Sequence, residues 1–299
     1  MAIRLQPLDP RGADRSAVTD LWRRSLGEVW PLEPAWHDSL GSAGVGAVDG
    51  RGVVVGFATV GARSALTSLV VDSAHRRHGI GRSLHDAALD LLPADGELGI
   101  GSGTGEDYVF PGVPENLPGA SEFFHACGWR WDYVAADLVQ RVGTYATPDG
   151  VAARAEGAGV EFRVLDDDRA DVLAFVDRYH HGWLDYYAEV DVRRILVGER
   201  AGEVVASLVF TLPEHVRNKW AALLGDGTGD LGCVGVRPDV EGQGIGTALV
   251  ALGTEILQAR GVTASWLQWT TRLSFYGYLG YRPWRTFLMS RMARDQLRH

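Results

Sequence analysis

The sequence predicts an α/β (α+β) fold built from two tandem domains that are related to each other. A glycine-rich turn occurs twice, at 79–81 and at 244–246, about one domain length apart in a chain of 299 residues. An aromatic pair, three further residues, a glycine and another aromatic residue also occur twice, at 123–129 and at 275–281. Because the two signatures come in the same order in both halves, they indicate a duplicated domain.

In the first half, apolar periodicity predicts the elements in turn. Alternation predicts a strand at 3–8, and apolar residues spaced three and four apart predict a helix at 14–26. The turn sequence Asp49-Gly50-Arg51-Gly52 between two β-rich runs predicts a hairpin. The remaining expected elements are the hairpin strands at 45–48 and 53–60, a strand at 66–71 before the glycine turn, a helix at 80–92, a strand at 97–100, a long ordered loop at 101–118, a helix at 120–127 and a strand at 132–142.

A segment rich in alanine, with Pro148-Asp149-Gly150 in its middle, predicts a linker between the halves. We therefore expect one domain at 1–145, a linker at 146–159 and a second domain at 160–299. In the second domain the same plan predicts strands at 160–165, 194–197, 204–212, 231–236, 264–269 and 283–292, and helices at 170–179, 245–260 and 272–279.

Composition limits the classes of function. Lys and Arg number 29 against 38 Asp and Glu, and this net charge of −9 argues against a general nucleic-acid binder. Cys127 and Cys233 are the only cysteines, so we expect neither a disulfide framework nor a metal site. The N-terminus lacks the apolar core of a signal peptide, and no apolar run is long enough to cross a bilayer. We expect a cytoplasmic protein, monomeric or homodimeric, without a membrane or nucleic-acid partner.

Both glycine turns have the context of an anion site. Each lies between a predicted strand and the N-terminus of a predicted helix, where unpaired backbone N–H groups bind phosphate. In the first half Arg76, Arg77 and His78 lie in the turn itself, where they favour phosphate binding over a purely solvated role. The sequence therefore predicts a pyrophosphate site in one or both halves.

The two motifs resemble those of the GNAT acetyltransferase superfamily, whose coenzyme loop has the pattern Q/R-x-x-G-x-G/A. Arg76-Arg77-His78-Gly79-Ile80-Gly81 matches this pattern fully, whereas the second copy has Glu241 in place of Gln or Arg. The late sequence Phe275-Tyr276…Gly280-Tyr281 is close to the family's F-Y-x-x-x-G-F. The resemblance covers nearly all of the chain, and it implies in each half a twisted, mixed, mostly antiparallel sheet that is splayed at its centre and flanked by helices.

The resemblance implies acetyl-CoA as co-substrate, bound by the glycine turns and the strands before them. Backbone N–H groups of those strands are placed to polarise the thioester carbonyl. Whether one or both halves bind the coenzyme stays open. The expected contacts are Val70, Val71, Arg76, Arg77, His78, Gly79, Ile80, Gly81, Arg82 and Ser83 in the first half, and Val234, Gly235, Val236, Gly242, Gln243, Gly244, Ile245, Gly246 and Thr247 in the second.

Tyr276 is the expected general acid, because a phenol with a pKa of about 10 holds a proton that it can give to a thiolate. In the resembled family this tyrosine faces the CoA sulfur, although a core aromatic residue has the same spacing. The first half has Phe124 at this place, which has no proton to give. We therefore expect the second half to carry out catalysis.

No general base stands out in the sequence. Asp230 and Glu255 are expected as solvated surface carboxylates, and at most one of His180 and His181 is expected to line a pocket. An acidic segment that contains Trp183, Tyr186, Tyr187, Asp185, Glu189 and Asp191 is a candidate site for a cationic acceptor.

The sequence thus predicts an acetyl-CoA-dependent N-acetyltransferase that acts by direct attack of a small-molecule primary amine, such as an amino sugar, an antibiotic or a polyamine. Two alternatives stay open. One is a non-catalytic CoA- or drug-binding protein built from degenerate acetyltransferase domains, because each half has one defect, Phe124 or Glu241. The other is a protein or peptide N-acetyltransferase.

Overall fold

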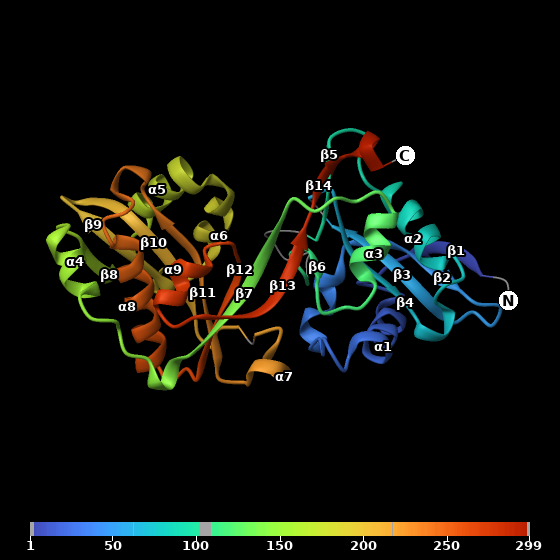
Figure 1. Cartoon of the computed structure of the whole chain (residues 1–299), viewed down its shortest axis with the longest axis horizontal. Coiled ribbons are helices and arrows are strands. Elements are labelled where there is room, and N and C mark those ends of the chain that lie inside the picture. Colours follow the sequence, from blue (N-terminus) through green and yellow to red (C-terminus); the bar gives the residue numbers. More distant parts are fainter. Residues whose placement is uncertain (1–2, 62, 102–108, 217, 298–299) are drawn as a thin grey trace. The chain divides into compact units, whose positions relative to one another are not determined.

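A computed structural model describes residues 3–61, 63–101, 109–216 and 218–297 (Figure 1). The chain forms two compact units. Unit 1 comprises Met1–Ala136 together with Arg285–His299, and unit 2 comprises Asp137–Trp284. Unit 1 is therefore built from both ends of the chain, and unit 2 from its middle.

In unit 1 a mixed sheet has the strand order β1-β2-β3-β4-β5-β14. All its neighbours for which a register is known are antiparallel except β4 and β5, which are parallel. Helix α2 packs against β3 through a buried face that includes Leu84 and Ala88. The elements of this unit are β1 (Arg4–Leu8), α1 (Arg15–Leu26), β2 (Ala43–Val48), β3 (Val54–Gly61), β4 (Ala65–Val71), α2 (Ile80–Leu89), β5 (Glu97–Ile100), β6 (Val113–Pro114), α3 (Ala120–Ala126) and β14 (Arg291–Ala293).

In unit 2 the strand order is β7-β12-β11-β10-β9-β8. From β8 to β11 each strand is antiparallel to its neighbour, and β11 is parallel to β12. Figure 1 shows helices on both faces of this sheet. The elements are α4 (Val151–Gly157), β8 (Glu161–Val164), α5 (Ala170–His180), α6 (Leu184–Glu189), β9 (Ile195–Arg200), β10 (Glu203–Thr211), α7 (Ala221–Leu224), β11 (Thr228–Val236), α8 (Ile245–Ala259), β12 (Ala264–Thr270) and α9 (Leu273–Tyr278). Strands β7 (Tyr133–Arg141) and β13 (Arg282–Met289) each have residues in both units.

The sheet of each unit opens between its two parallel strands. β11 and β12 pair only from Thr228–Asp230 to 264–266, although both strands continue beyond this stretch. In unit 1, β4 and β5 pair over only two positions, Ala65 with Gly99 and Leu66 with Ile100. The twisted, mostly antiparallel and centrally splayed sheets expected from the sequence are therefore present in both units.

The ends of the units differ from the contiguous division at 1–145, 146–159 and 160–299. Helix α4 forms within the expected linker, after Gly150 with a left-handed φ of +76°. The expected last strand at 283–292 is divided into β13 and β14, and these strands pair with β6 and β5 of unit 1. Of the expected long loop at 101–118, residues 102–108 lie outside the described part of the chain, and Phe110 packs at 4.8 Å from the ring of Trp30.

Candidate active site

The two glycine turns have the same backbone conformation. In unit 1, Arg77 and Gly79 have φ angles of +65° and +81° directly before α2. In unit 2, Gly242 and Gly244 have φ angles of +78° and +85° directly before α8. A residue other than glycine with such a positive φ angle carries a strain of roughly 1–2 kcal/mol. Arg77 therefore has a strained backbone at the position where the second turn has Gly242. Apart from its chain neighbours, no heavy atom of the described residues lies within 4 Å of a Cβ added to Gly79. Glycine is therefore needed here for the positive φ angle, and the space in front of the turn stays free.

A second glycine in each turn explains why the two sequence signatures occur together. A Cβ on Gly81 would lie 3.0 Å from the Phe123 ring, and a Cβ on Gly246 would lie 3.6 Å from the Phe275 ring. The first helical turn therefore packs against the first aromatic residue of the later motif. Phe124 in unit 1 and Tyr276 in unit 2 directly follow these contact residues in the sequence.

Side chains around the first turn bind main-chain carbonyls. Arg76 Nε donates to the carbonyl of Val71 at 2.9 Å, and Arg82 donates to the carbonyl of Ala126. Because a guanidinium has five N–H donors, these bonds leave donors for a phosphate. A ring nitrogen of His78 lies 2.8 Å from the carbonyl oxygen of Arg76.

Two arginines that the sequence analysis did not single out lie at the second turn. The Cβ of Arg154, in α4, is 3.3 Å from the position of a Cβ on Gly244, and its guanidinium lies 3.4 Å from the hydroxyl of Tyr278. Arg200 at the end of β9 donates to the side-chain oxygen of Gln243 at 3.1 Å. These cations stand beside the loop that carries Glu241, and they come from segments far from it in sequence.

β11 contains a bulge next to the splayed gap. Ser207 of β10 pairs with Gly235 and Val209 pairs with Gly232, so that Cys233 and Val234 together face Leu208. Cys233 has a φ of +51°. The hydroxyl of Tyr187 donates to the carbonyl of Cys233 at 3.1 Å and lies 2.9 Å from the hydroxyl of Ser207. Such a bulge redirects backbone groups out of the regular ladder.

His180 packs against the same strand. Its ring stacks on Trp183 at 4.6 Å, and its Nε2 would lie 2.6 Å from a Cβ on Gly235. This Nε2 is buried and has no hydrogen-bond partner within the described residues. Burial lowers the pKa of His180, and the nearby Glu241 partly offsets that effect. His181 instead pairs with Asp177 on the surface, so only His180 faces the sheet.

Tyr276 is buried, with its ring edge-on to Phe275 at 4.7 Å and to Tyr281 at 6.1 Å. Burial, and then the neighbouring Tyr281, raises the pKa of the Tyr276 phenol well above its usual value. The residue therefore keeps its proton throughout the physiological range. In unit 1, Phe124 makes the corresponding edge-on contact with Phe123 at 5.1 Å.

Asp230 is not the solvated surface carboxylate that the sequence suggested. It is the last residue of β11 that pairs with β12, where it lies opposite Trp266, and the splayed gap begins after it. Burial raises the pKa of its carboxyl to about 6, against the opposing effects of a hydrogen bond from Thr211 and of the charges of Arg194 and Lys219. Tyr186, a residue that is 44% exposed, belongs to the same electrostatic cluster, and burial, followed by the charge of Asp230, raises the pKa of its phenol to about 12. Glu255, in contrast, is exposed, as expected.

A buried charged pair stands beside this cluster and was missed by the sequence analysis. The carboxylate of Asp137, on β7, accepts hydrogen bonds from Trp266 Nε1 at 3.1 Å and from the backbone N–H of Trp269 at 2.7 Å. Lys219 Nζ lies 5.7 Å from the centre of the Trp266 ring. Burial raises the pKa of Asp137 to about 6 and lowers the pKa of Lys219 to about 8. Single charged residues in otherwise ordinary loops and strands give no motif by which to find them.

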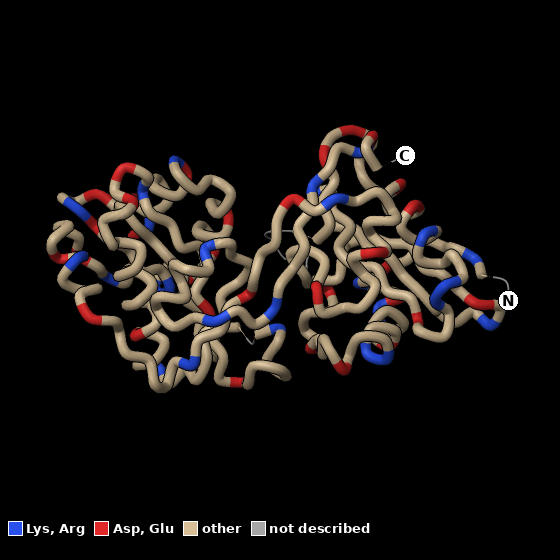
Figure 2. Tube along the Cα trace, in the orientation of Figure 1, with Lys and Arg blue, Asp and Glu red and all other residues tan. Residues whose placement is uncertain are grey.

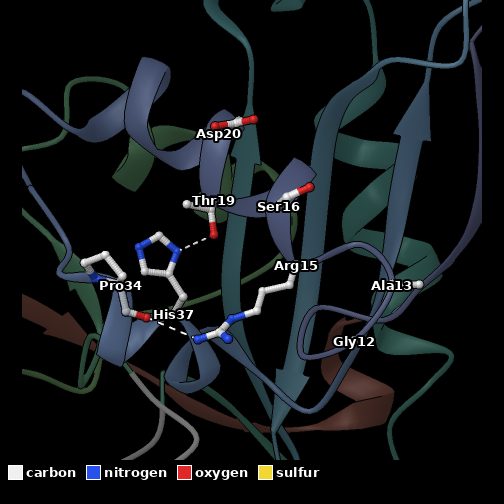
Figure 3. A pocket seen from close by; sticks show the side chains of 8 residues that line it. All are labelled: Gly12, Ala13, Arg15, Ser16, Thr19, Asp20, Pro34 and His37. Carbon is white, nitrogen blue, oxygen red and sulfur yellow. Dashed lines mark hydrogen bonds between the residues drawn. The ribbon is translucent and has the colours of Figure 1, made fainter.

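A cavity of about 520 Å³ lies in unit 1 beside α1 (Figure 3). There His37 is 2.6 Å from the hydroxyl of Thr19 and 3.1 Å from the carbonyl of Leu32, and burial lowers its pKa. Arg15 donates to the carbonyl of Pro34 at 3.3 Å. None of the residues predicted from the sequence is among those that line this cavity.

The described residues contain no cluster of three or more metal-ligating side chains. No helix among them is long and apolar enough to cross a membrane. Figure 2 shows Lys and Arg interspersed with Asp and Glu along the trace of each unit.

Comparison with known proteins gives a consistent result. The family model described as "Acetyltransferase (GNAT) family" matches residues 15–102 and 164–281. A mycothiol acetyltransferase of Cellulomonas flavigena is 31% identical over 76% of this chain, and one of Saccharopolyspora erythraea is 27% identical over 87% of it. The chain spans 64% of the first relative's length and 89% of the second's.

Among solved structures, the glucosamine N-acetyltransferase region of a fungal multi-domain GH3 beta-N-acetylglucosaminidase has a TM-score of 0.86 and 28% identity. The match covers 97% of this chain and 38% of that protein. A tandem GNAT protein from the clavulanic acid biosynthesis pathway, 15% identical with a TM-score of 0.62, shares the fold over 98% of both chains.

Proposed function

Because this chain belongs to the acetyltransferase (GNAT) family, we propose that it transfers the acetyl group of acetyl-CoA to the primary amine of an amino sugar. The observation that carries the proposal is the similarity over 97% of the chain to a region named as a glucosamine N-acetyltransferase. Relatives named mycothiol acetyltransferases support transfer to a small molecule.

Unit 2 is the proposed catalytic unit. It combines a glycine turn, a bulged strand beside the splayed gap and the protonated phenol of Tyr276. Unit 1 has the turn but carries Phe124 at the position of the acid. Both units have the same glycine turn, but only unit 2 has a tyrosine at the position of the acid. This difference favours a single reaction centre, in unit 2.

Asp230 is the proposed general base. A carboxylate with a pKa of about 6 is ionised at neutral pH, yet it is basic enough to take a proton from an amine as the new bond forms. Tyr186 is partly exposed and interacts electrostatically with Asp230, and an aromatic residue there suits a cationic amino sugar, because an ammonium is attracted to an aromatic face. The acceptor would thus enter beside α6, where the sequence analysis placed an acidic aromatic segment.

The proposed reaction is a direct transfer. The amine nitrogen attacks the thioester carbonyl carbon, and the C–N bond forms while a backbone N–H of the β11 bulge stabilises the charge on the carbonyl oxygen. Asp230 accepts the proton that leaves the nitrogen. As the C–S bond breaks, Tyr276 gives its proton to the departing sulfur, and the products are an N-acetyl amine and the thiol of CoA.

The test is a thiol-release assay with acetyl-CoA and a panel of acceptors: glucosamine, galactosamine, an aminoglycoside, spermidine and a peptide with a free N-terminus. Turnover of the amino sugars, with a product heavier by one acetyl group, is the expected result. Turnover of the peptide alone would replace the acceptor class with a protein N-terminus. Bound CoA without turnover of any acceptor would favour the non-catalytic binding protein.

A further inference from the structure

One buried phenol holds both strands at the β11 bulge. Tyr187, on α6, is fully buried, and its hydroxyl contacts Cys233 of β11 and Ser207 of β10. A carbonyl can only accept, so the single phenolic proton goes to Cys233 and the Ser207 hydroxyl donates to the phenol oxygen. The phenolic proton and the hydroxyl proton of Ser207 thereby each have an acceptor.

The rigidity of the peptide unit carries this restraint across the strand. The carbonyl of Cys233 and the N–H of Val234 belong to one planar trans peptide and point in opposite directions. Because the carbonyl of Cys233 binds the phenol that Ser207 of β10 shares, the N–H of Val234 points away from that contact, and the neighbour of β11 on its other side is β12. A hydrogen bond that fixes the direction of the Cys233 carbonyl therefore also fixes the direction of the Val234 N–H.

Unit 1 lacks this arrangement. Its β4 bulge lies at Thr67, four residues before the end of the strand, whereas Cys233 lies three residues before the end of β11. No residue of β4, all of which the structure describes, has a positive φ. Its hydroxyls instead bind the carbonyl of Leu40, to which Thr67 donates at 2.7 Å and Ser68 at 3.2 Å. The two units thus share the glycine turn but hold the preceding strand differently.

We propose that Tyr187 is a positioning residue, which holds the Cys233 carbonyl and so aims the Val234 N–H at the thioester oxygen. The inference rests on the proposed acetyl transfer. A preorganised donor of this kind acts on the transition state more than on the bound ground state, because charge develops on the oxygen only during attack. Its misalignment should therefore lower kcat with little effect on the KM for acetyl-CoA.

The variant Tyr187→Phe deletes the hydroxyl and keeps the ring that fills the core. Loss of an oxyanion donor costs about 10²–10³ in kcat, so a donor that is present but less well aimed should cost about tenfold. We expect that decrease in kcat with the KM for acetyl-CoA within about twofold of the wild type. Amide hydrogen exchange at 232–235 should quicken, because the peptide has lost its anchor.

Thr67→Val is the matched control. The Thr67 hydroxyl is also buried, lies in the β4 bulge of unit 1 and donates to the carbonyl of Leu40 at 2.7 Å. We expect Thr67→Val to lose thermal stability through its missing hydrogen bond but to keep kcat and the exchange rates at 232–235. If Tyr187→Phe does not fold, Ser207→Ala removes the bond to the phenol oxygen without touching the ring, with a smaller loss of kcat expected.

The outcomes separate the two proposals. A wild-type protein that acetylates no acceptor overturns the proposed function. In that case, hydrogen exchange at 232–235 still tests whether the Tyr187 hydroxyl anchors the Cys233 peptide. Unchanged exchange in Tyr187→Phe overturns the anchor whether or not the enzyme is active. Equal kcat losses in Tyr187→Phe and Thr67→Val would mean that Tyr187 has only a structural role, and this too overturns the inference.

Discussion

A phenol that stays protonated, such as that of Tyr276, can act as a general acid only where a basic group forms next to it, as the leaving thiolate of CoA does in the proposed reaction. Tyr276 has this property because burial opposes its ionisation, and none of the effects on its pKa within the described residues is a hydrogen bond to its hydroxyl. That hydroxyl therefore contributes little to the fold, and its removal should act mainly on the reaction.

Tyr276→Phe should lower kcat about 10²-fold, the usual contribution of a positioned general acid, with little change in thermal stability. Thiol release under saturating acetyl-CoA measures the effect. Tyr145→Phe is the control, because Tyr145 is as deeply buried, with both side chains 7% exposed. Full turnover by Tyr276→Phe would remove this residue from the acid's role.

Asp230 leads to opposite expectations for activity and stability. Its folded pKa of about 6 lies above the usual carboxyl value, so the folded state binds the proton more tightly than the unfolded chain does. Ionisation of Asp230 therefore costs stability as pH rises through this window, whereas catalysis needs the ionised form. We expect kcat/KM to fall as pH drops below about 6.

Asp230→Asn should abolish most turnover and remove this acidic limb, while its melting temperature at pH 7.5 should exceed that of the wild type. The gain should shrink at pH 5, where the wild-type carboxyl is already protonated. Differential scanning calorimetry at both pH values checks the sign. A variant that is both less stable at pH 7.5 and fully active would refute the base and the buried charge together.

At the scale of elements, helix α4 places Arg154 next to the second glycine turn, which contains the acidic residue Glu241. Arg154 of α4 and Arg200 of β9 flank the turn that contains Glu241. Arg154→Ala should weaken CoA binding by about three- to tenfold, more strongly at low salt, because a phosphate contact would lose its partner. Calorimetric titration with CoA measures the change, and Arg193→Ala, which removes an exposed arginine paired with Asp191, should leave binding unaltered.

The elements also show how far the sequence could lead. The two glycine turns, their helices and the aromatic motifs follow from local patterns, and the contact of Gly81 with Phe123 explains why these patterns recur together. Helix α4 was expected as a linker, because its alanines resemble a flexible segment and its packing against α8 is long-range. The pairing of β14 with β5 joins residues almost 200 positions apart in sequence, for which no local pattern exists. For the same reason Asp137 and Lys219, which meet only through the fold, escaped notice.

At the scale of the whole molecule, the two glycine turns predict two sites for CoA. Because only unit 2 has the acid Tyr276, we expect the reaction at only one of them. Gly79→Trp should remove one equivalent of bound CoA and leave kcat near the wild-type value, because its turn precedes Phe124. Gly244→Trp should remove the other equivalent and abolish turnover. Titration of both variants counts the sites, and loss of turnover in Gly79→Trp alone would assign catalysis to unit 1.

The make-up of unit 1 from both ends of the chain has a consequence for how the protein is made. A ribosome delivers 137–284 before Arg285–His299, so the middle unit has its whole sequence while the first unit still lacks β14 and the partner of β6. Residues that are translated before unit 2 are thus completed into their sheet only after unit 2 has been translated, and until then the edge of β5 lacks its partner β14. A stop within Arg285–His299 would spare the unit with Tyr276 and leave the sheet of unit 1 incomplete.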